Sequence, residues 1–355
     1  MMRKLHMNWM SGVRQPGVPS ALGAALLFGA GTPLAKWLLG TIDPWLLAGL
    51  LYFGSGVGLT LYRYVQHAPA VRLSRQELPW FAGAIVTGGM IAPVLLMIGL
   101  AGMSAAGVSL LLNAESVFTA LLAWFVFREN FDRRIALGML AIVAGAVALS
   151  WPTESGIMRV WPMLAVLGAC LAWGIDNNLT RKVSLTDATW IAAVKGMASG
   201  IVNLALAFWL GAALPSLPNL AGAMTVGFFA YGVSLTLFVV GLRHLGTART
   251  GAYFAIAPFF GAVLALLMGE PVTLPLIVAG ILMALGVWFH LTERHEHHHE
   301  HVAMAHAHEH VHDEHHQHQH AYPVASGTQH SHAHQHEPLS HVHAHFPDAH
   351  HQHRH

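Results

Sequence analysis

Polar side chains interrupt an apolar stretch at residues 160–182, which reads VWPMLAVLGACLAWGIDNNLTRK. The stretch begins like a membrane-spanning helix and then carries Asp176, Asn177 and Asn178 shortly before the basic residue Arg181. A carboxylate and two amides at membrane depth are costly unless they face a protein interior or a water-filled cavity. These three residues are therefore the first candidates for a functional site.

Lys195 lies in the next apolar stretch and is the natural partner of Asp176. At helical rise, Asp176 is ~7 Å and Lys195 ~12 Å from the same membrane edge, so antiparallel neighbours would bring them within one turn in depth. The sequence thus predicts an Asp176–Lys195 ion pair. The pair either only fixes helix register or lines a polar cavity, in which Trp173 would supply a flat wall beside the polar groups.

Glu115 and Lys36 are the other ionisable residues inside apolar stretches. Glu115 stands thirteen residues before Arg128, or ~20 Å at helical rise, which is near the bilayer midplane. It has no obvious partner at that depth and suits either proton coupling or a hydrogen-bonded structural acid. Lys36 lies near the end of its span, where its long stem can reach the interface, and we interpret it as structural.

The composition identifies an all-α polytopic membrane protein. Of 355 residues, 54% are hydrophobic and only 10% are charged, against roughly 25% charged in soluble domains. The single cysteine excludes an intramolecular disulfide. Apolar runs predict ten spans, at about 19–39, 44–63, 79–100, 103–127, 135–151, 160–180, 188–209, 219–242, 247–268 and 274–292.

The basic residues set the expected orientation. Arginine and lysine gather before the first span and after every even-numbered span, whereas the loops after odd-numbered spans carry only Arg159. Basic loops stay in the cytosol. We therefore expect a multi-pass protein of the inner (plasma) membrane, with N- and C-termini cytosolic.

The two halves of the chain repeat at a nearly constant offset. The matching pairs are Phe28 with Trp173, Lys36 with Arg181, Trp45 with Trp190, Phe118 with Phe260, Gly138 with Gly280 and Glu129 with Glu270, at offsets of 141 to 145 residues. A five-span unit has odd parity, so its second copy is inserted upside down. Inverted repeats of this kind build secondary transporters with a solute site near the midplane.

Two segments carry a family resemblance: GVSLLLNAESVFTALLAWFVFREN in the first copy and TGAYFAIAPFFGAVLALLMGEP in the second. The second has Pro258 and Gly269-Glu270, whereas the first has Ser116 in place of proline and Arg128 before its Glu. The chain resembles the EamA-type ten-span members of the drug/metabolite transporter superfamily over residues 20–290. The resemblance implies a small-solute transporter whose fold is ten helices in two inverted five-helix repeats.

We accordingly divide the chain into a cytosolic N-terminus (1–18), two five-helix EamA-like repeats (19–151 and 160–292) and a cytosolic tail (293–355). Residues 290–355 hold 25 of the 28 histidines and have no apolar period, so we expect a disordered tail. Closely spaced imidazoles bind Zn, Ni and Co. The candidate ligands are His297, His298, His299, His301, His306, His308, His310, His312, His315 and His316.

These features favour a secondary transporter that moves a small solute by alternating access. Its expected partners are the lipid bilayer, the solute and, at the tail, divalent metal ions; nucleic acid is not expected, and the oligomeric state is left open. No cofactor is required, no Walker-type loop is found, and the tail's two HExxH matches are expected by chance in such a tract, so we expect no enzyme. The alternatives are a divalent-metal transporter and a metal-sensing membrane protein.

The tail supports a direct prediction. Residues 290–355 should bind several Zn or Ni ions at pH 7.5, with affinity falling below about pH 6 because imidazole protonates near 6.5. Calorimetric titration of the tail at the two pH values measures this. Absence of binding at pH 7.5 would refute a metal-binding tail.

Overall fold

The computed structural model describes residues 17–71, 73–126, 133–149, 160–183, 186–291, 296–301, 304–310, 330–336 and 339–344. The chain divides into two compact units, Met1–Glu293 and Arg294–His355, which we describe separately.

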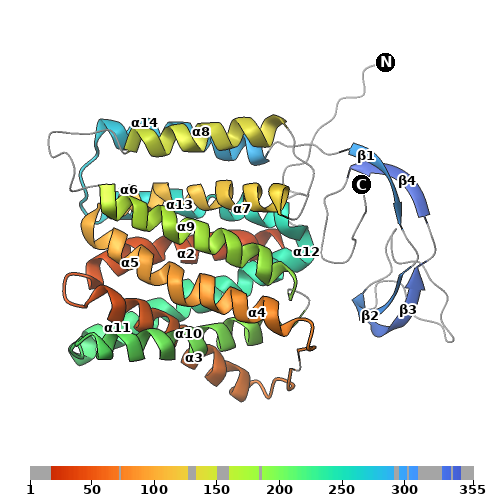
Figure 1. Cartoon of the computed structure of the whole chain (residues 1–355), viewed down its shortest axis with the longest axis horizontal. Coiled ribbons are helices and arrows are strands. Elements are labelled where there is room, and N and C mark those ends of the chain that lie inside the picture. The colour runs from red at the N-terminus through yellow and green to blue at the C-terminus, as the bar shows by residue number, and fades with distance from the viewer. Residues whose placement is uncertain are drawn as a thin grey trace. The chain divides into compact units, whose positions relative to one another are not determined.

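The first unit is a helical bundle (Figure 1). Its first half contains α2 (Val18–Leu38), α3 (Pro44–Val65), α4 (Leu78–Ala84), the π-helix η1 (Ile85–Ile91), α5 (Ala92–Gly102), α6 (Ala105–Leu111), α7 (Ala114–Phe125) and α8 (Arg133–Leu149). Its second half contains α9 (Val160–Arg181), α10 (Ala188–Trp209), α11 (Leu217–Val226), the π-helix η3 (Gly227–Val233), α12 (Ser234–Phe254), α13 (Ala257–Leu267) and α14 (Leu274–Leu291).

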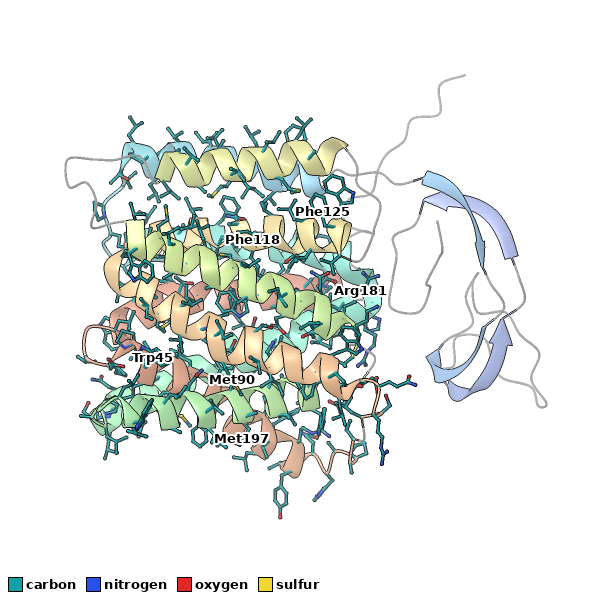
Figure 2. All side chains as sticks on the ribbon, in the orientation of Figure 1. Trp45, Met90, Phe118, Phe125, Arg181 and Met197 are labelled. Carbon is teal, nitrogen blue, oxygen red and sulfur yellow. The ribbon has the colours of Figure 1, made fainter. Side chains whose placement is uncertain are left out.

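The helices form layers in which the two halves alternate. Figure 1 shows α8 beside α14 along one side of the bundle, and α3 beside α10 along the opposite side. The first half therefore contributes one helix to each of these pairs and the second half the other. Trp45 and Arg181 lie at opposite ends of the bundle (Figure 2), and we name the ends after them.

The bundle has the length and surface of a membrane protein. Seven helical segments among the described residues are long and apolar enough to cross a bilayer, and three more apolar helices are shorter, at Ala136–Leu149, Ala257–Leu267 and Leu274–Phe289. Large apolar side chains face outward, including Leu217 and Leu267, which are 80% and 79% exposed. Exposed Trp37, Trp161 and Trp209 lie near helix ends, where amphipathic rings occupy a membrane interface.

Two predicted spans are broken helices. The span expected at 103–127 is interrupted at Leu112–Asn113, and α12 and α13 are separated at Ala255–Ile256. Pro258 is the second residue of α13, where a proline cannot continue the preceding helix, and this accounts for the second break. At the first break, the Asn113 amide donates to Leu110 O and the Ser116 hydroxyl donates to Asn113 O, each beside a backbone N–H donor to the same carbonyl. Local side-chain hydrogen bonds thus accompany this break, which has no proline.

The loop expected between the spans ending at 242 and beginning at 247 is not a loop, because α12 continues from Ser234 to Phe254. The chain nevertheless reverses within α12. A Cβ added at Gly241 would lie 2.9 Å from Cγ2 of Thr250, whereas nine residues of straight helix rise ~13.5 Å. The predicted change of direction is present, but helical turns carry it.

The π-helices repeat between the halves. η1 covers 85–91 and η3 covers 227–233, so each residue of η1 has a counterpart 142 positions later. This offset is the one found for Phe118 and Phe260 in the sequence. π-helical segments are rare and occur mostly at functional sites. Both halves thus place the same irregularity in their third long helical segment.

Glycines allow α3 and α10 to make backbone contact. A Cβ at Gly56 would collide with the backbone of Met197, and a Cβ at Gly196 would lie 2.6 Å from the backbone N of Gly56. Small residues favour helix association in membranes because they allow close van der Waals packing, and lipid provides no hydrophobic driving force between helices. This close pair connects the two halves on one side of the bundle.

The tail differs from the prediction of a disordered segment. β1 (Glu296–His301) pairs with β4 (Leu339–Ala344), and β2 (Met304–His310) pairs with β3 (His330–His336), all antiparallel. The prediction is wrong for these four segments. Strands pair through backbone hydrogen bonds, which form even where the side chains show no apolar periodicity. His312, His315 and His316 lie outside the described residues, and the described residues contain no group of three potential metal ligands.

An ion pair joins α3 to α10 at the Arg181 end. Arg63 Nη1 donates to Asp187 Oδ2 at 2.6 Å, and Asp187 also caps α10 by accepting from Trp190 N. Partial burial by itself would raise the pKa of Asp187, because it disfavours the charged form. Hydrogen bonds from Arg63 and from the backbone N–H groups of Trp190 and Thr189 outweigh burial, so the pKa of Asp187 is lowered below its ordinary value.

We predict that Asp187→Ala destabilises the protein by about 1 kcal/mol more than Asp187→Asn, because Asn keeps the helix cap. A lowered folded-state pKa stabilises the fold above the unfolded value of about 3.9 and ceases to do so as the pH falls through the folded value. The Tm gap between wild type and Asp187→Asn in detergent should therefore shrink below about pH 4. Equal gaps at pH 7 and pH 3 would contradict this assignment.

Candidate functional site

A cavity of about 460 Å³ lies inside the bundle, including the part open to the outside. Residues from both halves line it, in α2, α3, α7, α9, α10, η3 and α12. The lining residues are Phe28, Tyr52, Glu115, Trp173, Asp176, Asn177, Lys195, Ala230, Tyr231, Ser234, Leu235, Phe238 and Phe254. This composition, mostly aromatic and aliphatic side chains with a few converging polar groups, is typical of a small-molecule site.

The predicted Asp176–Lys195 ion pair is present. Lys195 Nζ donates to Asp176 Oδ2, and Thr180 Oγ1 donates to the other carboxylate oxygen at 2.9 Å. Lys195 is 2% exposed and Asp176 5% exposed. Two charges at such burial persist only when they neutralise one another, since a single buried charge costs several kcal/mol. The pair joins α9 to α10 at the cavity wall.

Glu115 has the partner that the sequence did not reveal. Asn177 Nδ2 donates to Glu115 Oε1 at 2.7 Å and makes a longer bond to Thr119 Oγ1 at 3.4 Å. The interpretation of Glu115 as isolated at its depth is therefore wrong. Its partner is a neutral amide, and within the described part of the chain no cation pairs directly with Glu115 as Lys195 does with Asp176.

The π-helix η1 brings its backbone into the same site. The carbonyl of Gly88 accepts from Tyr52 OH at 2.7 Å and from Trp173 Nε1 at 3.0 Å. A Cβ at Gly88 would collide with the Asp176 carboxyl. Glycine is therefore required here, because η1 packs directly against the Asp176 carboxyl.

Aromatic rings form a continuous wall around Phe28. Its ring centroid lies 5.7 Å from that of Trp173, 5.8 Å from Tyr231 and 5.2 Å from Phe254. Tyr52 extends the wall through Tyr231 at 5.3 Å. These separations are those of edge-to-face and tilted aromatic contacts. A flat apolar body can lie against this wall.

The structure brings five of the six predicted site residues to one cavity: Glu115, Trp173, Asp176, Asn177 and Lys195. Asn178 is the exception. Its amide donates to Gly174 O at 2.8 Å and Thr119 O at 3.3 Å, so it packs α9 against α7. Asp176 faces the cavity, and two helical positions further on Asn178 points about 200° away from it, so Asn178 faces α7 instead.

Sequence reasoning missed most of the aromatic wall. Phe28 carried a usable signal, because it is the repeat counterpart of Trp173 and the two rings touch. Tyr52, Tyr231 and Phe254 carried none, since single aromatic residues are ordinary in apolar helices. Lys36 has a structural role, as interpreted from the sequence, because its Nζ donates to Leu100 O and Ala101 O near the end of α5, at 2.7 and 3.2 Å.

Comparison with known proteins supports the resemblance to EamA-type transporters. The EamA-like transporter family matches residues 15–151 and 160–292. A protein of Methanothermobacter thermautotrophicus named "Uncharacterized transporter" is 30% identical over 294 residues, covering 77% of this chain and 85% of the relative. "Uncharacterized transporter YyaM" of Bacillus subtilis is 20% identical over 279 residues, covering 75% and 90% respectively.

A crystal structure with 16% sequence identity superposes with a TM-score of 0.61, covering 76% of this chain and 95% of the other. At this identity the likeness shows a shared fold alone. The tandem family matches and the relatives show more: this chain is a multi-pass membrane protein that belongs to the EamA-like transporter family.

Proposed function

We propose that the protein is a secondary transporter that carries a small organic solute across the inner membrane by alternating access, with the solute in the cavity beside Asp176 and Lys195. The observation that carries this proposal is a cavity with polar, ionisable groups that residues of both halves of the bundle line. An aromatic wall suits an organic body, whereas a soluble core would fill such a space with packed side chains.

We further propose ten spans in two inverted repeats. The seven long apolar segments and three shorter apolar helices sum to ten. The π-helices at an offset of 142 residues support equivalent halves, and the pairing of α8 with α14 and α3 with α10 supports a twofold relation between them. Ten spans place both termini on one side.

The charges support a cytosolic Arg181 end. Arg63 pairs with Asp187 there, and Arg243 Nη2 donates to Thr186 O at 2.9 Å in the same region. Positive residues remain on the cytosolic side. Asp176 lies five residues before Arg181, so the ion pair stands nearer to this end of the solute path.

A second set of contacts closes the Trp45 end. Glu270 accepts from Ala105 N at 2.6 Å and Ala106 N at 2.8 Å, at the start of α6. Lys36 holds the last carbonyls of α5 beside it. We name these contacts the Glu270 clamp. Because Glu270 belongs to the second half and α6 to the first, the clamp joins the halves and must release if this end is to open.

Glu270→Gln should weaken the clamp, since hydrogen bonds to charged groups are worth about 1.5–3 kcal/mol. In a Cys170→Ser background, Ala106→Cys is buried and should label slowly with a membrane-impermeant maleimide. Adding Glu270→Gln should raise that rate about tenfold. Exposed Ala101→Cys should label equally in both backgrounds; an unchanged Ala106→Cys rate would show that the clamp does not hold this end closed.

Removing one partner of the buried pair tests the solute path. Asp176→Asn and Lys195→Met should each reduce folded yield or transport, because each leaves an unpaired buried charge. The double variant should recover yield while transport into proteoliposomes stays lost, using a solute identified by a thermal-shift screen of metals and metabolites. Recovery of transport would reduce the pair to a structural role.

The matched control is the second ion pair between helices. Arg63→Gln combined with Asp187→Asn removes the pair at the Arg181 end, outside the cavity lining. This control should retain transport. Wild-type yield and flux in both single variants would remove Asp176 and Lys195 from the proposal.

The tail is proposed to bind Zn, Ni or Co ions independently of solute transport. The alternative is a divalent-metal carrier whose tail collects cytosolic metal. Deleting residues 293–355 separates the two, because an organic-solute carrier keeps its flux without the tail, whereas a metal carrier loses metal-specific flux or its regulation.

A further inference from the structure

We infer that the solute is an organic primary ammonium ion with an aromatic or flat apolar body, and that Glu115 and Asn177 hold its ammonium group. The inference rests on the proposed function, because it names the class of solute for the same cavity. Three features carry it: the charge balance of the lining, the orientation of its free acceptors, and the aromatic wall.

The carboxylates and the ammonium that line the cavity carry a net charge of −1 when ionised. Two carboxylates, Glu115 and Asp176, face one ammonium, Lys195, which gives −2 + 1 = −1. Lys195 and Thr180 occupy the Asp176 carboxylate, whereas the Asn177 amide is the one donor to the Glu115 carboxylate among the described residues. A monovalent cation at Glu115 completes the balance, and an anionic solute would increase the imbalance.

The hydrogen-bond pattern specifies the kind of cation. In the part of the chain that the structure describes, no group donates to Oε2 of Glu115 or to Oδ1 of Asn177. Neither oxygen is among the fully buried unsatisfied atoms of that part, which indicates that both border open space in the cavity. A primary ammonium has three N–H donors and can satisfy both oxygens, whereas a quaternary ammonium has none.

Asn177 has one useful orientation. Its Nδ2 must point to Glu115, since the reverse would set an amide oxygen against a carboxylate oxygen. That orientation leaves Oδ1 as the remaining acceptor of the amide. Glu115 therefore fixes Asn177 so that a second acceptor is available beside the first.

The aromatic wall receives the rest of the molecule. The rings of Trp173, Tyr231 and Phe254 each contact Phe28, and all four line the cavity. A ring at this wall gains aromatic contacts, and a nearby ammonium gains from the ring faces within about 6 Å. An arylalkylamine with a two-carbon linker has both parts in one small molecule.

Binding to the full-length protein in detergent tests the class, with four phenyl probes that share one body. We expect 2-phenylethylamine at pH 7.5 to bind at least tenfold more tightly than 3-phenylpropionate, 2-phenylethanol or phenyltrimethylammonium. Equal or tighter binding of any of these three would overturn the inference. Wild-type protein suffices for this comparison, so it holds even if a variant fails to fold.

Two neighbouring amides provide a matched pair of variants. Asn177→Ala and Glu115→Gln should each weaken 2-phenylethylamine binding at least tenfold, whereas Asn178→Ala should leave it within twofold because Asn178 faces α7. Equal losses in the two asparagine variants would contradict the assigned ammonium site.

Solute flux in proteoliposomes distinguishes failure of the ammonium class from failure of the proposed transport function. Transport of an anionic or neutral solute but not of arylalkylamines would overturn the ammonium class and retain the transporter. Amine binding with no transport of any solute tested would retain the binding site and overturn the proposed function.

Discussion

The buried Asp176–Lys195 pair is the interaction on which the rest of the site depends. Each charge is nearly excluded from water, and neither is tolerable alone. Their contact requires α9 and α10 to lie at one depth, and Gly88 must lack a side chain so that η1 can pack against the carboxyl. One electrostatic requirement therefore positions three helical segments around the cavity.

Irregular helices make the cavity possible. A regular bundle with apolar interfaces would close on itself, whereas η1 and η3 widen the helix and redirect its carbonyls. Tyr52 OH and Trp173 Nε1 both donate to Gly88 O in η1, and these hydrogen bonds hold both rings at the wall. The breaks at Leu112–Asn113 and Ala255–Ile256 interrupt the neighbouring segments. The same types of irregularity occur in both halves, but the ionisable residues Glu115, Asp176 and Lys195 have Ala257, Gly31 and Leu50 as their counterparts at the repeat offsets.

This asymmetry divides the tasks of the two halves. Equivalent backbones supply a pair of similar shapes that can exchange roles during transport. The polar chemistry is concentrated at α7, α9 and α10, while the Glu270 clamp holds the Trp45 end by backbone N–H groups. In the proposed transport cycle, closure and recognition would use different residues, so that one could change while the other remains intact.

The sequence by itself determined the membrane class, the positions of the helices, the repeat offset and the Asp176–Lys195 pair, because hydropathy, charge placement and the cost of buried charge act locally along the chain. Only the tertiary structure decided which amide faces the cavity, that Asn177 serves Glu115, and that Phe28, Tyr231 and Phe254 meet there. It also decided that α12 reverses without a loop and that the tail pairs its strands. Helix rotation and long-range contacts set these features, and no local pattern records them.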